Sequence, residues 1–176
     1  FIAEIRKRTG LTFKIIGPQE EARLALIGCH NLIEEDAKSV LVLDIGGGST
    51  ELSLVDAGQA RSNGLDGMLK RAPIRAWTSI PLGVVTLTEA FNHLGEEEAY
   101  PAMMERVRGY VEPWAKQHGI RDLLADDNAY IIGTSGTVTC VAGVHFGLER
   151  YRRDLVDGKW MDKPGCDETM QALITA

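Results

Sequence analysis

A glycine-rich stretch between two apolar runs is the part of this sequence best suited to chemistry. Residues 40–56 read VLVLDIGGGSTELSLVD. Glycine has no Cβ, so its backbone can approach a ligand closely, and successive loop amides can bind an anion without a cationic side chain. A plain hairpin turn, which needs only one glycine or Asn-Gly, is the alternative. We favour a phosphate loop made of Gly46, Gly47, Gly48, Ser49 and Thr50.

Two carboxylates flank this loop. Asp44 ends the first apolar run and Glu51 begins the second. Carboxylate oxygens near phosphates are the ligands that Mg²⁺ uses, often through water. The sequence therefore predicts a Mg²⁺ site at Asp44 and Glu51.

A second loop combines glycine with hydroxyl residues. Residues 131–139 read IIGTSGTVT, a β-type run that leads into a helix. Free amides at a helix N-terminus bind anions, although Ser and Thr are also ordinary helix caps. Two such loops after neighbouring strands suggest a clamp on phosphates. The second phosphate loop is expected at Gly133, Thr134, Ser135, Gly136 and Thr137.

Other nucleotide motifs are missing from the sequence. It has no Gly-Lys-Ser/Thr of a Walker A loop and no G-x-G-x-x-G that opens a helix. A P-loop and a Rossmann nucleotide site are therefore disfavoured.

A pair of glutamates lies in a helix that follows a Gly-Pro break. Residues 15–28 read IIGPQEEARLALIG, which places Glu20 and Glu21 in the first turn. Acidic residues there stabilise the helix dipole, and composition alone favours that interpretation. A catalytic role would need one carboxylate to reach a phosphate site and take a proton from water.

The elements that position these residues follow from apolar periodicity. The sequence predicts strands over residues 11–16, 40–45, 51–55, 74–80 and 129–132. It predicts helices over residues 1–9, 19–33, 84–91, 101–118 and 138–144. A turn is expected at residues 56–59 and a loop-rich segment at residues 149–166.

From residue 40 onward the predicted order is β-β-β-α-(α)-β-α. Short links make the first three strands antiparallel neighbours, and the later strand, which follows helices, can add in parallel. This order predicts an α/β fold with an RNase H-like mixed sheet flanked by helices, as in actin/hexokinase-type ATPases. Residues 1–37 are expected to be the last strand and connecting helix of a preceding domain, and residues 38–176 a second RNase H-like domain, truncated at its C-terminal end.

Composition excludes several classes of protein. The 176 residues carry a net charge of −6, which makes the chain a poor generic binder of nucleic acid or membrane surfaces. No apolar run approaches the roughly 18 residues of a membrane span. The three cysteines lack Cys-x-x-Cys spacing and predict reduced thiols in a cytoplasmic protein, with Cys29 and Cys140 in the core. The dispersed histidines predict no metal site.

Four stretches together resemble the Ppx/GppA family of exopolyphosphatases and guanosine pentaphosphate phosphohydrolases. They are GPQEEARL (17–24), LDIGGGSTEL (43–52), SIPLGVVTLTEAF (79–91) and IIGTSGT (131–137). The resemblance implies that Glu21 is the catalytic base, that Asp44 and Glu51 hold Mg²⁺, and that the two loops bind phosphate. The implied reaction releases orthophosphate from polyphosphate or guanosine pentaphosphate by in-line transfer to water.

The chain also departs from the family pattern. Its second loop reads Thr-Ser-Gly-Thr where Thr-Ala-Gly-Thr or Gly-Gly-Thr is expected. The Asp-x-Gly-Ser phosphate loop that opens the family's first domain does not occur in the sequence. We therefore expect this fragment alone to be weakly active or inactive, and a homodimer is possible in the full-length protein.

Two other functions remain open on the sequence alone. An ATP-using kinase or ATPase of the same superfamily shares the glycine loop but does not require Glu21. A non-catalytic sensor of polyphosphate or an alarmone requires both loops but not Glu21. Mutation of Glu21 separates an enzyme from a sensor.

Overall fold

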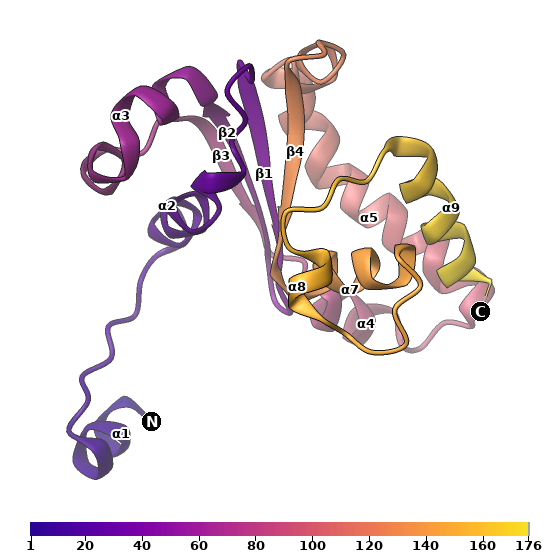
Figure 1. Cartoon of the computed structure of the whole chain (residues 1–176). Helices are drawn as coiled ribbons and strands as arrows, with labels where there is room; N and C mark the ends of the chain where they lie inside the picture. The colour runs from indigo at the N-terminus through magenta and orange to yellow at the C-terminus, as the bar shows by residue number, and fades with distance from the viewer. Residues whose placement is uncertain (176) are drawn as a thin grey trace.

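A four-stranded mixed sheet forms the centre of the molecule (Figure 1). The computed structural model describes residues 1–175, apart from the side chain of residue 96. The strands are β1 (Ser39–Ile45), β2 (Thr50–Asp56), β3 (Ile74–Ile80) and β4 (Ala129–Thr134). The helices are α1 (Ile2–Thr9), α2 (Pro18–Gly28), α3 (Ala57–Lys70), α4 (Val84–Phe91), α5 (Glu96–Gln117), α6 (Ile120–Leu123), α7 (Ser135–His145), α8 (Arg153–Val156) and α9 (Lys163–Ile174), with a 3₁₀ turn η1 (His30–Leu32).

The strand order is β3-β2-β1-β4. Strand β1 pairs antiparallel with β2, β2 pairs antiparallel with β3, and β4 joins the other side of β1 in parallel. The short loop of residues 46–49 favours antiparallel pairing of β1 with β2. Helix α3 lies between β2 and β3, so the predicted β-β-β order with short links is wrong at this point. The return through α4, α5 and α6 allows the parallel pairing of β4 with β1. The predicted α/β, RNase H-like architecture is confirmed.

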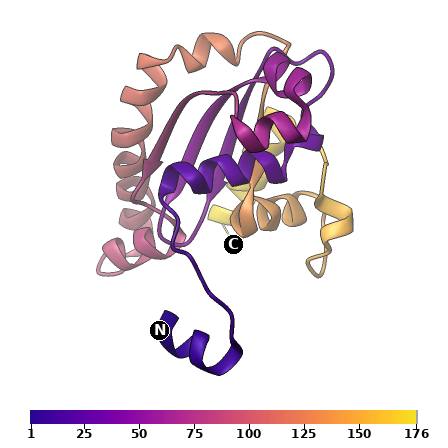
Figure 2. The same ribbon diagram turned by 90° about the vertical axis from the view of Figure 1, so that its left-hand side faces the viewer.

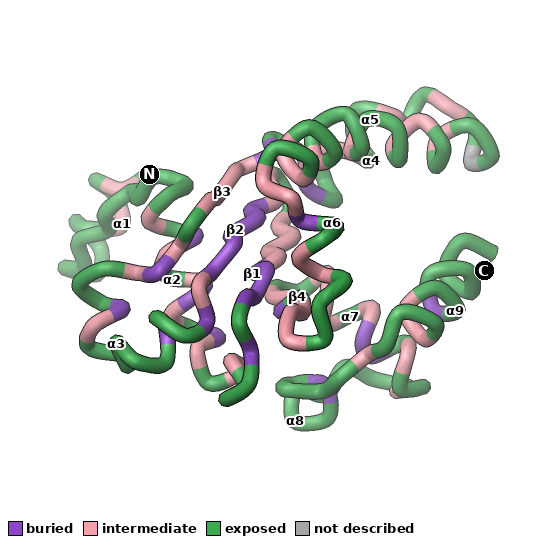
Figure 3. Tube along the Cα trace, turned by 90° about the horizontal axis from the view of Figure 1, so that it is seen from above, coloured by how far each residue is buried: buried purple, intermediate pink, exposed green. Residues whose placement is uncertain are grey.

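Helices cover both faces of this sheet (Figure 2). Alternate residues of a strand point to opposite faces. On one face, Val40 and Val55 pack with Leu26 of α2 and Met68 of α3. On the other face, a second apolar cluster packs against α5 and α6; its buried members are Leu41, Leu52, Leu54, Ile80 and Ile120. The buried residues accordingly concentrate in β1 and β2 (Figure 3).

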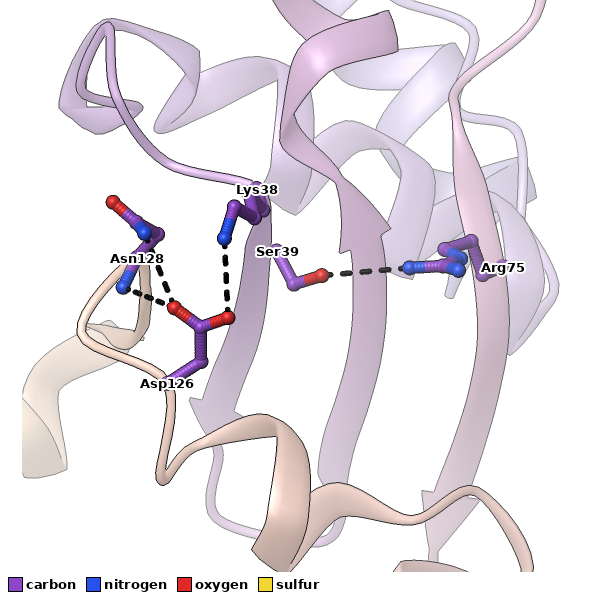
Figure 4. A network of polar contacts seen from close by, with 5 residues as sticks. All are labelled: Lys38, Ser39, Arg75, Asp126 and Asn128. Carbon is purple, nitrogen blue, oxygen red and sulfur yellow. Dashed lines mark hydrogen bonds and ion pairs between the residues drawn. The ribbon is translucent and has the colours of Figure 1, made fainter.

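Polar contacts hold the end of the sheet where β1 begins (Figure 4). The Nζ of Lys38 lies 3.2 Å from an Asp126 carboxylate oxygen, and the other oxygen of Asp126 accepts a bond from the Asn128 backbone amide at 2.9 Å. Arg75 donates to the hydroxyl of the buried Ser39 at 3.4 Å. The glycine loop follows the opposite end of β1, so these contacts anchor the strands away from the candidate site.

The strand predicted over residues 11–16 is wrong for this chain. Residues 10–17 form an extended connection without strand assignment between α1 and α2, which leaves α1 apart from the sheet (Figures 1 and 2). The side chains of Leu11, Phe13 and Ile15 are 58%, 51% and 82% exposed. A strand needs a neighbour for its amides and carbonyls, and no strand of the described residues pairs with this segment.

Other boundaries differ for local reasons. The predicted turn at residues 56–59 is the start of α3, because Asp56 caps the helix by accepting from the Gln59 amide at 2.9 Å. The helix predicted over residues 19–33 ends at Gly28. The segment 149–166 contains α8 and the start of α9.

The two predicted core cysteines differ. Cys29 is buried, whereas Cys140 is exposed, so the core assignment of Cys140 is wrong. Burial raises the pKa of the Cys29 thiol to about 11. In residues 1–175, no helix combines the length and the apolar character needed to cross a membrane.

Candidate functional site

A row of four polar side chains crosses the sheet beside the glycine loop. Asp44 of β1 lies opposite Glu51 of β2 and also pairs in register with Thr134 of β4. Glu51 in turn lies opposite Ser79 of β3. Residues in register point to the same face of a sheet. Strand alternation places this row on the face that α2 and α3 cover, in continuation of the buried Val40 and Val42.

The two carboxylates of this row repel each other. Glu51 is only 4% exposed, and its Oε1 accepts a hydrogen bond from the Ser79 hydroxyl at 2.8 Å. Burial, followed by the negative charge of Glu51, raises the pKa of Asp44, while the hydroxyl groups of Thr134 and Ser135 act in the opposite direction. A cation bound between Asp44 and Glu51 would relieve this repulsion.

The carboxylate pair fits a hard divalent cation that keeps most of its water. Among the described residues, no group of three or more His, Cys, Asp and Glu side chains could hold a metal ion. Mg²⁺ is commonly held by one or two carboxylates, with waters and substrate phosphate oxygens completing its ligands. Asp44 and Glu51 supply that donor set, and Glu21 does not join it in this chain.

The glycine loop is a tight, partly exposed turn. The amide of Gly46 donates to the carbonyl of Ser49 at 3.0 Å, which closes the loop. Gly47 and Gly48 at its tip are exposed. The hydroxyl of Thr50 donates to the Leu82 carbonyl at 2.8 Å. Thr50 therefore fastens the loop to the following segment, while the loop amides remain the candidates for phosphate.

The second loop lies against the first. The hydroxyl of Thr137 donates to the carbonyl of Ile45, the residue before the glycine loop, at 3.0 Å. Helix α7 begins at Ser135, and its N-cap residue Thr134 makes no side-chain capping bond. The first amides of α7 thus keep their capacity to bind an anion. The two predicted phosphate loops are neighbours, as a clamp requires.

Two residues of the second loop have special backbone positions. Ser135 has φ 74°, in the left-handed region that favours glycine. Such strain often collects at functional sites. Gly133 serves packing, because a Cβ at this position would collide with Val138 of α7. Gly136 is exposed and has open space around it.

The two glutamates of α2 have different surroundings. Arg23 binds both carboxylate oxygens of Glu20, at 2.7 and 2.6 Å, and also donates to the Leu69 carbonyl at 2.9 Å. The hydrogen bonds from Arg23 hold the pKa of Glu20 below its usual value. Glu21 is exposed, and within the described chain its carboxylate makes no hydrogen bond or ion pair, although its backbone amide donates to the Gly17 carbonyl at 3.1 Å. Glu21 is therefore the glutamate whose carboxylate is open to a ligand.

Sequence reasoning missed two contributors to this site. Ser79 orients Glu51, and Gly83 lies against the glycine loop. Both fall in the stretch SIPLG at residues 79–83, which contributed to the family resemblance but supplied no predicted site residue. Their contribution depends on pairing between strands, which local sequence does not specify.

A comparison with models of protein families identifies one family. The model of the Ppx/GppA phosphatase family matches residues 1–151. A comparison with curated protein sequences finds no significant match.

Solved structures share the fold. An exopolyphosphatase from Cytophaga hutchinsonii has a TM-score of 0.72 at 20% identity, covering 99% of this chain and 51% of its own. An exopolyphosphatase-like protein has a TM-score of 0.70 at 24% identity, with coverages of 99% and 51%. A Ppx/GppA family member from Aquifex aeolicus has a TM-score of 0.64 at 23% identity, with coverages of 99% and 50%. The chain thus spans about half the length of these relatives.

Proposed function

Since the chain belongs to the Ppx/GppA phosphatase family, we propose that the full-length protein hydrolyses a terminal phosphoanhydride. The proposed substrates are inorganic polyphosphate and guanosine pentaphosphate, each of which presents a terminal phosphate to the same loops. The observation that carries this proposal is the contact between Thr137 and Ile45, which brings two amide-rich loops together beside the Asp44–Glu51 pair.

Each part of the site has a proposed role. The amides of the glycine loop and of the α7 N-terminus hold the terminal phosphate. Asp44 and Glu51 hold Mg²⁺, which when bound neutralises charge on the phosphate oxygens. Glu21 accepts a proton from the attacking water. Positioning and charge neutralisation of this kind supply most of the catalysis in phosphoryl transfer.

The surroundings of α2 support Glu21 over Glu20 as the base. A general base needs a free lone pair within reach of water. Both oxygens of Glu20 already accept from Arg23. Glu21 is exposed and unpaired within the described chain. The mechanism therefore assigns the proton transfer to Glu21 and a structural role to Glu20.

We expect these 176 residues alone to hydrolyse substrate more slowly than the full-length protein. Its sequence lacks the first-domain phosphate loop that the family resemblance leads us to expect. A terminal phosphate would then contact the two loops described above, without the loop of the first domain. Phosphate release by this chain at the rate of the full-length protein would contradict this proposal.

Paired variants of the full-length protein test the proposed function. Glu21→Gln is expected to lower kcat by roughly 100-fold or more, the range of general-base catalysis, while tripolyphosphate binding stays within about threefold. Glu20→Gln is the matched control and should retain kcat within about threefold. Equal kcat values for the two variants would contradict the role of Glu21 as the general base. Phosphate binding by the wild type without any turnover would favour a non-catalytic sensor.

A further inference from the structure

The N-terminus of α4 docks onto the glycine loop through backbone hydrogen bonds. The amide of Val84 donates to the Gly46 carbonyl at 3.1 Å. The amides of Val85 and Thr86 donate to the Gly47 carbonyl at 2.9 and 3.2 Å. The first amides of α4, which would otherwise attract an anion, are thus occupied by the loop itself.

This docking fixes the direction of two loop amides. The chain has no cis peptide bond in its described residues, so the C=O and N–H of each peptide unit point in opposite directions. The carbonyls of Gly46 and Gly47 point to α4. The amides of Gly47 and Gly48, which belong to the same two peptide units, therefore point away from α4, at the exposed tip of the loop.

Side-chain contacts hold α4 in this position. The Thr50 hydroxyl ties the loop to the Leu82 carbonyl at 2.8 Å. The Thr86 hydroxyl accepts from the Gly83 amide at 2.8 Å. A Cβ on residue 83 would collide with the backbone of Gly46 and Gly47. Only glycine therefore allows the approach that the three backbone bonds require.

We propose that the segment Leu82–Thr86 is a positioning element that orients the Gly47 and Gly48 amides toward phosphate. The inference rests on the proposed function, since it says how the first phosphate loop acquires its binding geometry. Gly83 and the side chain of Thr50 act through the position of the loop, because the Thr50 hydroxyl already donates to the Leu82 carbonyl.

Two perturbations, each with a matched control, test this role. Gly83→Ala pushes the loop away from α4, and Gly95→Ala is its control, because a Cβ at Gly95 meets nothing within 4 Å. Thr50→Val removes the bond to Leu82, and Thr50→Ser should restore it. Thr88→Val is the control for loss of a hydroxyl, because the Thr88 hydroxyl donates to the Val84 carbonyl at 2.8 Å within α4 and, among the described residues, to no group of the loop.

Binding of inorganic tripolyphosphate, followed by the amide NMR signals of Gly47 and Gly48, is the functional readout. Gly83→Ala and Thr50→Val should each weaken binding by about tenfold or more, as expected for loss of hydrogen bonds to a charged group. Thr50→Ser and both controls should bind as the wild type does. Wild-type affinity in both Gly83→Ala and Thr50→Val would overturn the proposal.

A second readout separates failure of this inference from failure of the proposed function. Couplings across the hydrogen bonds from Val84 to Gly46 and from Val85 to Gly47 are measured without ligand. They should be present in the wild type and lost in Thr50→Val and Gly83→Ala. If the wild type binds no tripolyphosphate, the proposed function is contradicted. The couplings still test the positioning role separately, because their persistence in both variants would overturn it.

Discussion

At the scale of single residues, the carboxylate pair of Asp44 and Glu51 opposes folding unless it has a partner. Their strands place them directly opposite each other, and Glu51 is almost fully buried. Like charges in such a cross-strand pair destabilise a sheet. A divalent cation bound between the two carboxylates would offset their repulsion, which accounts for their position beside an amide-rich loop.

Asp44→Asn should therefore stabilise the cation-free chain and remove its response to Mg²⁺. Loss of the like-charge pair is expected to raise the free energy of unfolding by about 0.5–1 kcal/mol. Millimolar Mg²⁺ should raise the Tm of the wild type, because a cation that binds the folded state stabilises it, but not that of the variant. The control is Asp66→Asn on the exposed side of α3, which should keep the Mg²⁺ response. A response to Mg²⁺ that survives in Asp44→Asn would argue against a metal site at this pair.

Ser135 offers a second test at this scale. Its φ of 74° costs a residue with a side chain about 1–2 kcal/mol. Ser135→Gly relieves that strain but adds entropy to the unfolded chain, so a net gain of about 0.5–1 kcal/mol in unfolding free energy is expected. Urea denaturation measures it. Ser135→Ala, which keeps the strain, should show no gain, and equal stability of the two variants would contradict a strained Ser135.

At the scale of elements, Gly133 of β4 allows α7 to pack closely against the sheet. Gly133→Ala should lower the free energy of unfolding by about 1–3 kcal/mol, because its Cβ would collide with Val138. In a double-mutant cycle, Val138→Ala should recover part of this loss. Gly136→Ala is the control and should change stability by less than about 0.5 kcal/mol, since the space around it is open. Additive losses at residues 133 and 138 would contradict the contact.

Helices and strands could be predicted where the local sequence strongly favoured one type of secondary structure. The runs at residues 40–45 and 74–80 are rich in β-branched residues and closely match β1 and β3. Helix α3 was not predicted, because Gly58 and Gly64 weaken its helical propensity. Tertiary packing overrides that weakness by burying Ala57, Ala60 and Met68.

The positions of the two loops in the candidate site could also be predicted from local sequence, whereas their binding of phosphate stays a prediction. The two loops were identified because glycine and hydroxyl chemistry is local, and the structure brings them together. The partner of Glu51 and the support from α4 depend on strand pairing and helix docking, which the sequence does not specify locally. That Glu21 does not join Asp44 and Glu51 in a group of three metal-binding side chains is likewise a property of the three-dimensional arrangement.

At the scale of the whole molecule, the segment between α1 and α2 has the sequence pattern of a strand but no neighbouring strand among the described residues. Leu11, Phe13 and Ile15 alternate as in a strand, yet all three are exposed. The chain spans about half the length of its structural relatives. The assignment of residues 1–37 to a preceding domain stays a prediction, and it expects this segment to pair within that domain.

Hydrogen exchange can test that assignment. In the described chain, the amides of residues 12–16 should exchange at rates close to those of an unfolded peptide, because they lack strand partners. In the full-length protein, alternate amides of this segment should be strongly protected. Unprotected amides in the full-length protein would contradict a strand of a preceding domain.

The central claim is that these loops serve hydrolysis of a terminal phosphoanhydride. Its most direct test is phosphate release by the full-length protein with Mg²⁺, measured in parallel on long-chain polyphosphate, guanosine pentaphosphate and ATP. We predict release from polyphosphate, from guanosine pentaphosphate or from both, with little from ATP. Release from ATP alone would contradict the claim and would return Glu21 to the role of a residue that stabilises a helix dipole.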